Sequence, residues 1–122
     1  MTRLNSLGLP DYLDTVRRIA LALPGVEDTI ASGVHVFKLR GKMLVRMKDR
    51  ETLVLPVKMA ERGPLIETQP DVFYITPEYK DWPAVLVHLA RVDEAELRRL
   101  IVQAWRDIAP KKLLEQYENR GA

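Results

Sequence analysis

The fold is decided by residues 38–50, which run Lys38-Leu39-Arg40-Gly41-Lys42-Met43-Leu44-Val45-Arg46-Met47-Lys48-Asp49-Arg50. Every basic residue here has an even number: Lys38, Arg40, Lys42, Arg46, Lys48 and Arg50. The odd positions from 37 onward are mostly apolar: Phe37, Leu39, Met43, Val45 and Met47. Successive side chains of a β-strand point to opposite faces of a sheet, so the alternation predicts one cationic face and one apolar face. The stretch therefore predicts an amphipathic β-hairpin.

The turn of this hairpin is marked by Gly41. A two-residue loop at 41–42 would pair Phe37 with Arg46 and mix charge with core, because a slip of one residue moves every side chain to the other face. A three-residue loop at 40–42 pairs Leu39 with Met43 and Phe37 with Val45, which keeps the cationic face whole. The sequence therefore predicts an odd-length loop at 40–42.

The positive charge of the chain is concentrated in this hairpin. Asp49 is the one acidic residue in the stretch, so its thirteen residues carry +5, whereas the whole chain carries +2. The sequence pI of about 9.0 permits contact with nucleic acid but does not require it.

Length and composition limit the class of protein. A chain of 122 residues with 47% hydrophobic residues fits one domain, residues 1–122, with a real core. No apolar run approaches 18 residues, and the start of the chain lacks a long apolar segment, so we expect no transmembrane helix, no signal peptide and no membrane partner. The absence of cysteine excludes disulfides, zinc–thiolate sites and thiol catalysis. We expect a cytoplasmic protein.

Helical patterns lie at both ends of the chain. An apolar stripe predicts a helix over 11–23, closed by Pro24 and Gly25. A second stripe predicts a helix over 94–108, where Asp93 and Glu96 form a variant of the capping box. Pro110 opens a further helical piece, and a short helix fits 57–68.

The middle of the chain is rich in strands, expected at 29–40, 43–48, 52–56, 72–76 and 82–89, with a loop at 77–81. The last strand is nearly all apolar and is expected to be buried on both faces. This order of elements predicts an α+β domain in which helices pack on one face of a mainly antiparallel sheet.

Four segments, in this order, resemble the MmcQ/YjbR family across roughly residues 10–115: residues 21–28, 36–43 with their glycine-lysine-hydrophobic turn, Lys80-Asp81-Trp82 before an apolar strand, and 93–113. The spacing of the lysine-tryptophan segment is one residue shorter than in the family. The resemblance implies a fold similar to CyaY, the bacterial frataxin, a double-wing arrangement and a DNA-binding role. That implied role rests on fold and surface charge.

The basic hairpin has two interpretations. In one, Lys38, Arg40, Lys42, Arg46, Lys48 and Arg50, with Lys80, contact the phosphates of duplex DNA without sequence specificity. In the other, the hairpin is an ordinary solvated sheet face whose charge opposes aggregation, on a module that binds protein or a small molecule.

Aromatic and histidine residues offer further candidates. Trp82 could stack on a base beside Tyr79 and Lys80, but the favoured interpretation places it in the core at the start of a buried strand. Trp105 and the methionines at 43, 47 and 59 are expected in the core. His35 and His88 are expected to be packed, hydrogen-bonded side chains.

No catalytic constellation or phosphate-loop motif is present, so we expect no enzyme. The carboxylates Asp11, Asp14, Glu27 and Asp28 are interrupted by Arg17 and Arg18 and make a poor acidic ridge. We therefore expect no metal and no cofactor. The sequence predicts a monomer or weak dimer.

Overall fold

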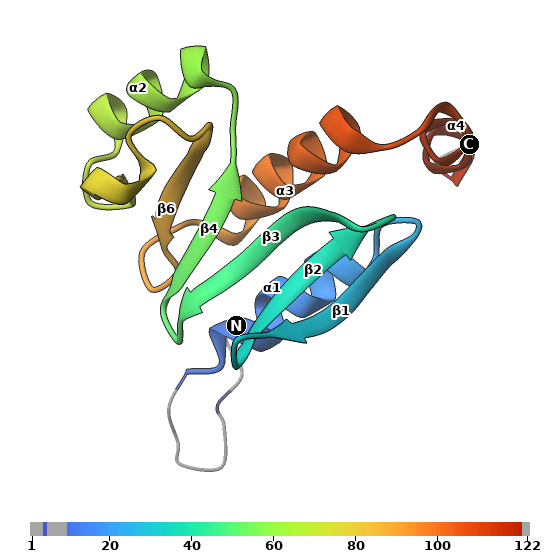
Figure 1. Ribbon diagram of the computed structural model, residues 1–122, viewed down its shortest axis with the longest axis horizontal. Helices are drawn as coiled ribbons and strands as arrows, with labels where there is room; N and C mark the ends of the chain where they lie inside the picture. Colours follow the sequence, from blue (N-terminus) through green and yellow to red (C-terminus); the bar gives the residue numbers. More distant parts are fainter. Residues whose placement is uncertain (1–3, 5–9, 121–122) are drawn as a thin grey trace.

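The computed structural model describes residue 4 and residues 10–120. Six strands and four α-helices follow one another along this part of the chain (Figure 1). They are α1 (Tyr12–Leu21), β1 (Val26–Ala31), β2 (Val34–Leu39), β3 (Lys42–Asp49), β4 (Thr52–Pro56), α2 (Met59–Thr68), β5 (Phe73–Tyr74), a 3₁₀ turn η1 (Pro77–Tyr79), β6 (Ala84–His88), α3 (Glu94–Ile108) and α4 (Lys111–Arg120). No described helix is both long and apolar enough to cross a bilayer.

The strands form one antiparallel sheet in the order β1-β2-β3-β4-β6-β5. Figure 1 looks onto this sheet with α1 and α3 behind it. These two helices cover one face, which we call the helix face, and we call the opposite face the open face. The prediction of an α+β domain with a mainly antiparallel sheet is confirmed.

The core is divided between the two faces of the sheet. Leu53 and Leu55 of β4 join the main cluster beneath α1 and α3, whereas Val54 between them joins a second cluster on the open face. β6 alternates in the same way, and Ala84 to Val87 have no exposed surface. The prediction that this strand is buried on both faces is confirmed for 84–87.

The predicted terminal helices are confirmed, and their caps explain their starts. Asp11 accepts a hydrogen bond from the Asp14 amide, and Asp93 accepts one from the Glu96 amide. The Glu96 carboxylate bonds to Gln69 instead of returning to the cap, so the capping box is half formed. The helical piece after Pro110 is α4, whose Leu113 and Tyr117 pack against the main cluster.

The prediction of one strand over 29–40 is wrong. A tight turn at Ser32 and Gly33 divides this region into β1 and β2, which pair with each other. β1 begins at Val26, three residues before the predicted start of the strand at 29. Three smaller differences are that β5 contains only Phe73 and Tyr74, that η1 occupies part of the predicted loop at 77–81, and that α2 begins at Met59 rather than 57.

The predicted three-residue loop is also wrong. Leu39 pairs with Lys42, so the turn contains two residues, Arg40 and Gly41, at φ of 50° and 82°. Two successive positive φ values match the twist of flanking strands, and glycine adopts such an angle without strain. A bulge at Leu44 then restores the pairing of Phe37 with Val45, which the sequence did predict.

Candidate nucleic-acid interface

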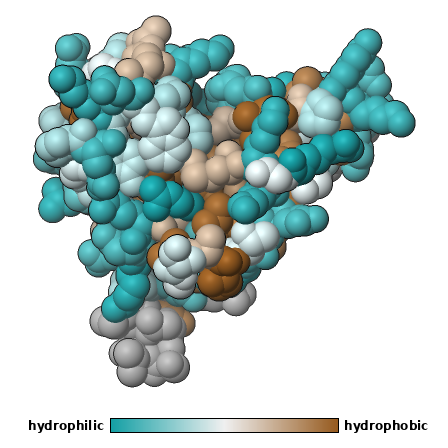
Figure 2. Space-filling model, viewed as in Figure 1, coloured by the Kyte–Doolittle hydropathy of each residue, from teal (hydrophilic) through white to brown (hydrophobic). Residues whose placement is uncertain are grey.

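The open face carries three of the predicted phosphate contacts: Lys38, Arg46 and Lys48. Their neighbours Phe37 and Met47 are buried in the main cluster on the helix face, and side chains alternate along each strand. All three cations are half-buried. Figure 2 shows this face, where hydrophilic side chains surround a strip of apolar ones.

Two of these cations are attached to η1. An Arg46 guanidinium nitrogen donates to the Tyr79 hydroxyl at 2.9 Å, and the Lys48 ammonium lies 3.6 Å from a Glu78 carboxylate oxygen. Tyr79 itself is buried at 4% exposure against Val54 and Leu86. η1 therefore covers part of the open face and brings the residues that follow it to the basic strands.

The prediction that all six hairpin cations share one face is wrong. Directly opposed residues of an antiparallel pair point to the same side, so Lys42, opposite Leu39, points to the helix face. Arg40 lies in the exposed turn, and Arg50 lies in the turn at the other end of β3. The two-residue turn and the bulge change the alternation, so Met43 packs in the open-face cluster.

Lys80 is exposed directly after η1, and the structure brings it to the margin of the open face. Its carbonyl oxygen accepts a hydrogen bond from Arg62 of α2 at 2.8 Å. The other Arg62 nitrogen donates to the carbonyls of Tyr79, Trp82 and Ala84 at 2.9, 2.8 and 3.4 Å. Arg62 therefore holds the backbone of residues 79–84, a role that its local sequence does not indicate.

Trp82 is not in the core, and the favoured interpretation of it was wrong. Its side chain is 38% exposed and stacks on Tyr79 with ring centroids 5.4 Å apart. β6 begins only at Ala84, because Pro83 has no amide hydrogen to contribute to a ladder. Pro83 was therefore the sequence signal that the strand does not start at Trp82. Trp105, by contrast, has no exposed surface.

The methionines divide among three environments. Met47 is buried in the main cluster, and Met43 packs against the open-face cluster. Met59, predicted to be core, is 48% exposed at the start of α2.

Both histidines are packed against neighbours, as predicted, and the predicted side-chain hydrogen bond is present at His35. His88 stacks on Tyr74 with centroids 4.3 Å apart. A His35 ring nitrogen lies 2.7 Å from Asp28, which also accepts from Arg17 at 3.1 Å. Desolvation raises the pKa of the Asp28 carboxyl, but the hydrogen bonds from His35 and Arg17 outweigh it, so its pKa lies below the ordinary value. Within the described residues no three His, Asp or Glu side chains are grouped to hold a metal.

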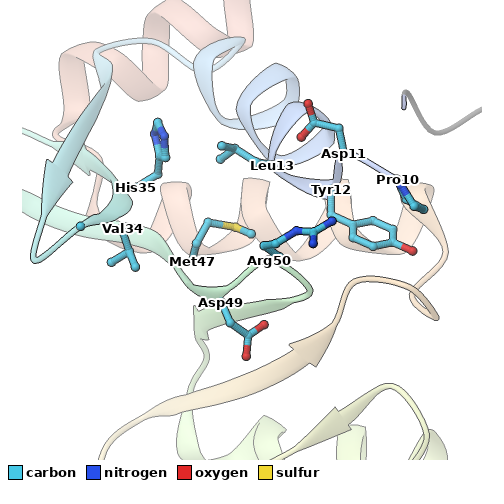
Figure 3. A pocket seen from close by; sticks show the side chains of 10 residues that line it. Pro10, Asp11, Tyr12, Leu13, Val34, His35, Met47, Asp49 and Arg50 are labelled. Atoms are coloured by element: carbon cyan, nitrogen blue, oxygen red, sulfur yellow. The ribbon is translucent and has the colours of Figure 1, made fainter. Parts of the chain in front are cut away.

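A separate pocket of about 370 Å³ opens beside His35 on the helix face (Figure 3). Its apolar wall comes from Tyr12 and Leu13 of α1 with Val34 and Met47 of the sheet. Arg50 extends into it, whereas the carboxylate of Asp49 points away. Arg50, one of the predicted phosphate contacts, therefore lies on the helix face, away from Arg46 and Lys48.

Comparison with known proteins identifies relatives along most of the chain. The family model described as YjbR matches residues 21–107. Uncharacterized proteins of Mycobacterium tuberculosis and Mycobacterium bovis are 32% identical over 123 residues, covering 85% of this chain and 93% of theirs. The match to the family model begins at the last residue of α1, includes every strand of the sheet, and ends one residue before the end of α3.

A solved structure shares the fold. The crystal structure of Deinococcus radiodurans protein DR2400, with a DUF419 domain, superposes with a TM-score of 0.70. The two chains are 20% identical, and the match covers 82% of this chain and 80% of that one. At this identity the likeness concerns the arrangement of helices and strands.

Proposed function

The chain belongs to the YjbR family, and from that premise we propose that it is a cytoplasmic module that binds nucleic acid weakly through the open face of its sheet. The ligand is the phosphate backbone of duplex DNA, contacted without sequence specificity. Cationic side chains meeting phosphates release counterions from the duplex, which accounts for most non-specific affinity. Phosphate contacts carry no sequence information, so affinity should vary little with DNA sequence.

The observation that supports this proposal is the gathering of cations from separate segments. Lys38 of β2, Arg46 and Lys48 of β3, and Lys80 after η1 approach one face or its margin, although Lys80 is 32 positions beyond Lys48. Arg46 has five N–H donors and gives one bond to Tyr79, so others remain for a phosphate. Glu78 is exposed and Lys48 is half-buried, and ion pairs in contact with solvent are weak enough to exchange for a phosphate.

The salt dependence of duplex binding tests the proposal. Four phosphate contacts predict that the logarithm of the association constant falls with the logarithm of salt concentration with a slope of about −3.6. We expect Lys38→Ala with Lys48→Ala to reduce the magnitude of that slope by about 2, similarly for different DNA sequences. Arg46 is left intact because it also holds Tyr79. Fluorescence anisotropy of a labelled duplex across a salt series measures the slope.

A matched control removes the same charge from another surface. Arg98 and Arg99 are exposed on α3, behind the sheet, and pair with Glu94 and Glu96 of the same helix. Arg98→Ala with Arg99→Ala should leave the slope within about 0.5 of the wild-type value, because contacts within a Debye length of about 10 Å dominate binding. Equal effects of the two double variants would indicate a response to net charge and contradict the assigned face.

A second candidate function, binding a small molecule, is favoured by the pocket beside His35. It combines an apolar wall with the Arg50 guanidinium, which has no ion-pair partner among the described residues. Pockets of this composition are the usual places for small ligands. If the protein does not bind duplex DNA at low salt, small-molecule binding becomes the favoured function. The basic strands would then be an ordinary solvated face of the sheet.

A further inference from the structure

The exposed indole of Trp82 is held in a fixed position. Arg62 donates to the carbonyls of four residues between 79 and 84, so the backbone on both sides of Trp82 is tied to α2. Trp82 and Tyr79 stack with ring planes 20° apart, and Tyr79 is buried beneath. Tyr79 covers one face of the indole, and Trp82 as a whole is 38% exposed. The structure thus presents an aromatic surface that needs no ordering before it binds.

Pro83, the residue after Trp82, lines a groove between two strands. β3 and β4 pair only between Arg46–Asp49 and Thr52–Val54, and they diverge towards the other end (Figure 1). The groove in this opening has a volume of about 490 Å³. It is lined mainly by apolar residues, among them Met43 of β3, Val57 after β4 and Pro83, the neighbour of Trp82.

Cations flank the indole and the groove. Lys58 lines the groove and Lys80 precedes Trp82 by two residues; both are exposed, and in the described part of the chain neither forms an ion pair. The groove also contains one carboxylate, that of Asp107, which accepts a hydrogen bond from Gln103. An exposed indole with Lys80 two residues before it and Lys58 in the groove that Pro83 lines matches a ligand that carries flat rings on an anionic chain.

From this arrangement we propose that Trp82 stacks on a base of single-stranded nucleic acid while Lys58 and Lys80 contact the adjacent phosphates. Stacking on an exposed aromatic ring tolerates any base, because every base has a π face. A duplex keeps its bases stacked on one another and offers none without unstacking. This inference rests on the proposed function and extends it: the open-face cations bind the backbone of a duplex, and the indole adds a contact that only single strands can use.

The two tryptophans of the chain supply an internal reporter. Trp105 is fully buried, with its ring nitrogen donating to the Pro24 carbonyl, so added ligand cannot reach it. We expect a twelve-residue oligothymidylate to quench the emission of the full chain. In Trp82→Phe, where Trp105 is the remaining emitter, this quenching should be absent. Quenching that persists in Trp82→Phe would overturn the proposal.

Affinity measurements test the same contact. Trp82→Ala should weaken binding of the oligothymidylate about tenfold, equivalent to about 1.4 kcal/mol, and change binding of a twelve-base-pair duplex less than about twofold. Trp82→Phe retains an aromatic face and should recover most of the loss. Leu21→Ala, which removes an exposed apolar side chain at the end of α1, is the matched control and should change neither affinity.

The outcomes separate this inference from the proposed function. Duplex binding with the expected salt slope, together with unchanged oligothymidylate affinity in Trp82→Ala, would overturn the stacking role and leave the proposed function standing. An equal loss for both ligands would also overturn the assignment of the indole contact to single strands. Absence of binding to either ligand by the wild-type chain would overturn both.

Discussion

At the scale of single residues, Phe37 and Lys38 show how alternation along a strand assigns neighbours to different environments. Phe37 has no exposed surface and lies beneath α1 and α3, whereas Lys38 is half-buried on the open face opposite Glu27 of β1. The sequence predicted this difference because strand geometry depends only on local spacing.

We expect the two residues to differ strongly in their contribution to stability. Phe37→Ala should lower the free energy of unfolding by about 3–5 kcal/mol, because it removes core contacts and leaves a cavity. Lys38→Ala should change it by less than about 0.5 kcal/mol. Urea unfolding followed by circular dichroism measures both. Similar midpoints for the two variants would show that Phe37 and Lys38 have been assigned to the wrong faces of the sheet.

Residue roles that depend on distant contacts were beyond the reach of the sequence. Arg62 bonds to carbonyls 17 to 22 positions away, and nothing in its local pattern indicates these partners. The exposure of Trp82 could have been predicted from the sequence, because a proline at 83 argues against a central strand at that position. The candidate site was thus partly predicted: three of its seven cations lie on the open face and Lys80 lies at its margin, whereas the indole was assigned to the core.

At the scale of elements, hydrophobic periodicity predicted which segments exist better than it predicted their register. The limits of α3 were predicted correctly, since its stripe and its cap are both local signals. The hairpin of β2 and β3 was predicted, but its two-residue turn and its bulge at Leu44 were not. A bulge inserts one residue without a distinct sequence signature, so it shifts alternation where pattern analysis assumes that alternation continues.

Two glycines in turns allow backbone strain to be separated from crowding. Gly41 has φ of 82° with open space around a Cβ position, whereas Gly25 has φ of 79° and a Cβ there would lie 2.9 Å from Leu39 Cδ1 and 3.1 Å from Leu113 Cδ1. Gly41→Ala should cost about 1–2 kcal/mol, the cost of a left-handed conformation for alanine. Gly25→Ala should cost more, because buried Leu39 must also move. Urea unfolding midpoints of the two variants test this order. Equal losses of stability would contradict crowding of a Cβ at position 25 by Leu39.

At the scale of the whole molecule, the family-matched segment and the packed core have different limits. The match covers residues 21–107, but α1 supplies Val16, Ile19 and Ala20 to the main cluster from before that segment. From beyond it, Tyr117 of α4 lies 5.2 Å from the Trp105 ring, measured between centroids. The fold class followed from the order of elements, yet the sequence alone could not show which terminal elements close the core.

The last prediction concerns which part of the chain folds alone. A fragment of residues 21–107 lacks the buried side chains of α1 and the partly buried apolar side chains of α4, and it exposes the surfaces that they cover. Burial of each aliphatic side chain contributes about 1.5–3 kcal/mol, and a domain retains only about 5–15 kcal/mol of net stability. We therefore expect this fragment to show no cooperative thermal transition by circular dichroism. A fragment of residues 10–120, which keeps both helices, should unfold cooperatively like the full chain. Cooperative unfolding of 21–107 near the full-chain midpoint would show that α1 and α4 are dispensable, and the core would then be confined to the sheet and α3.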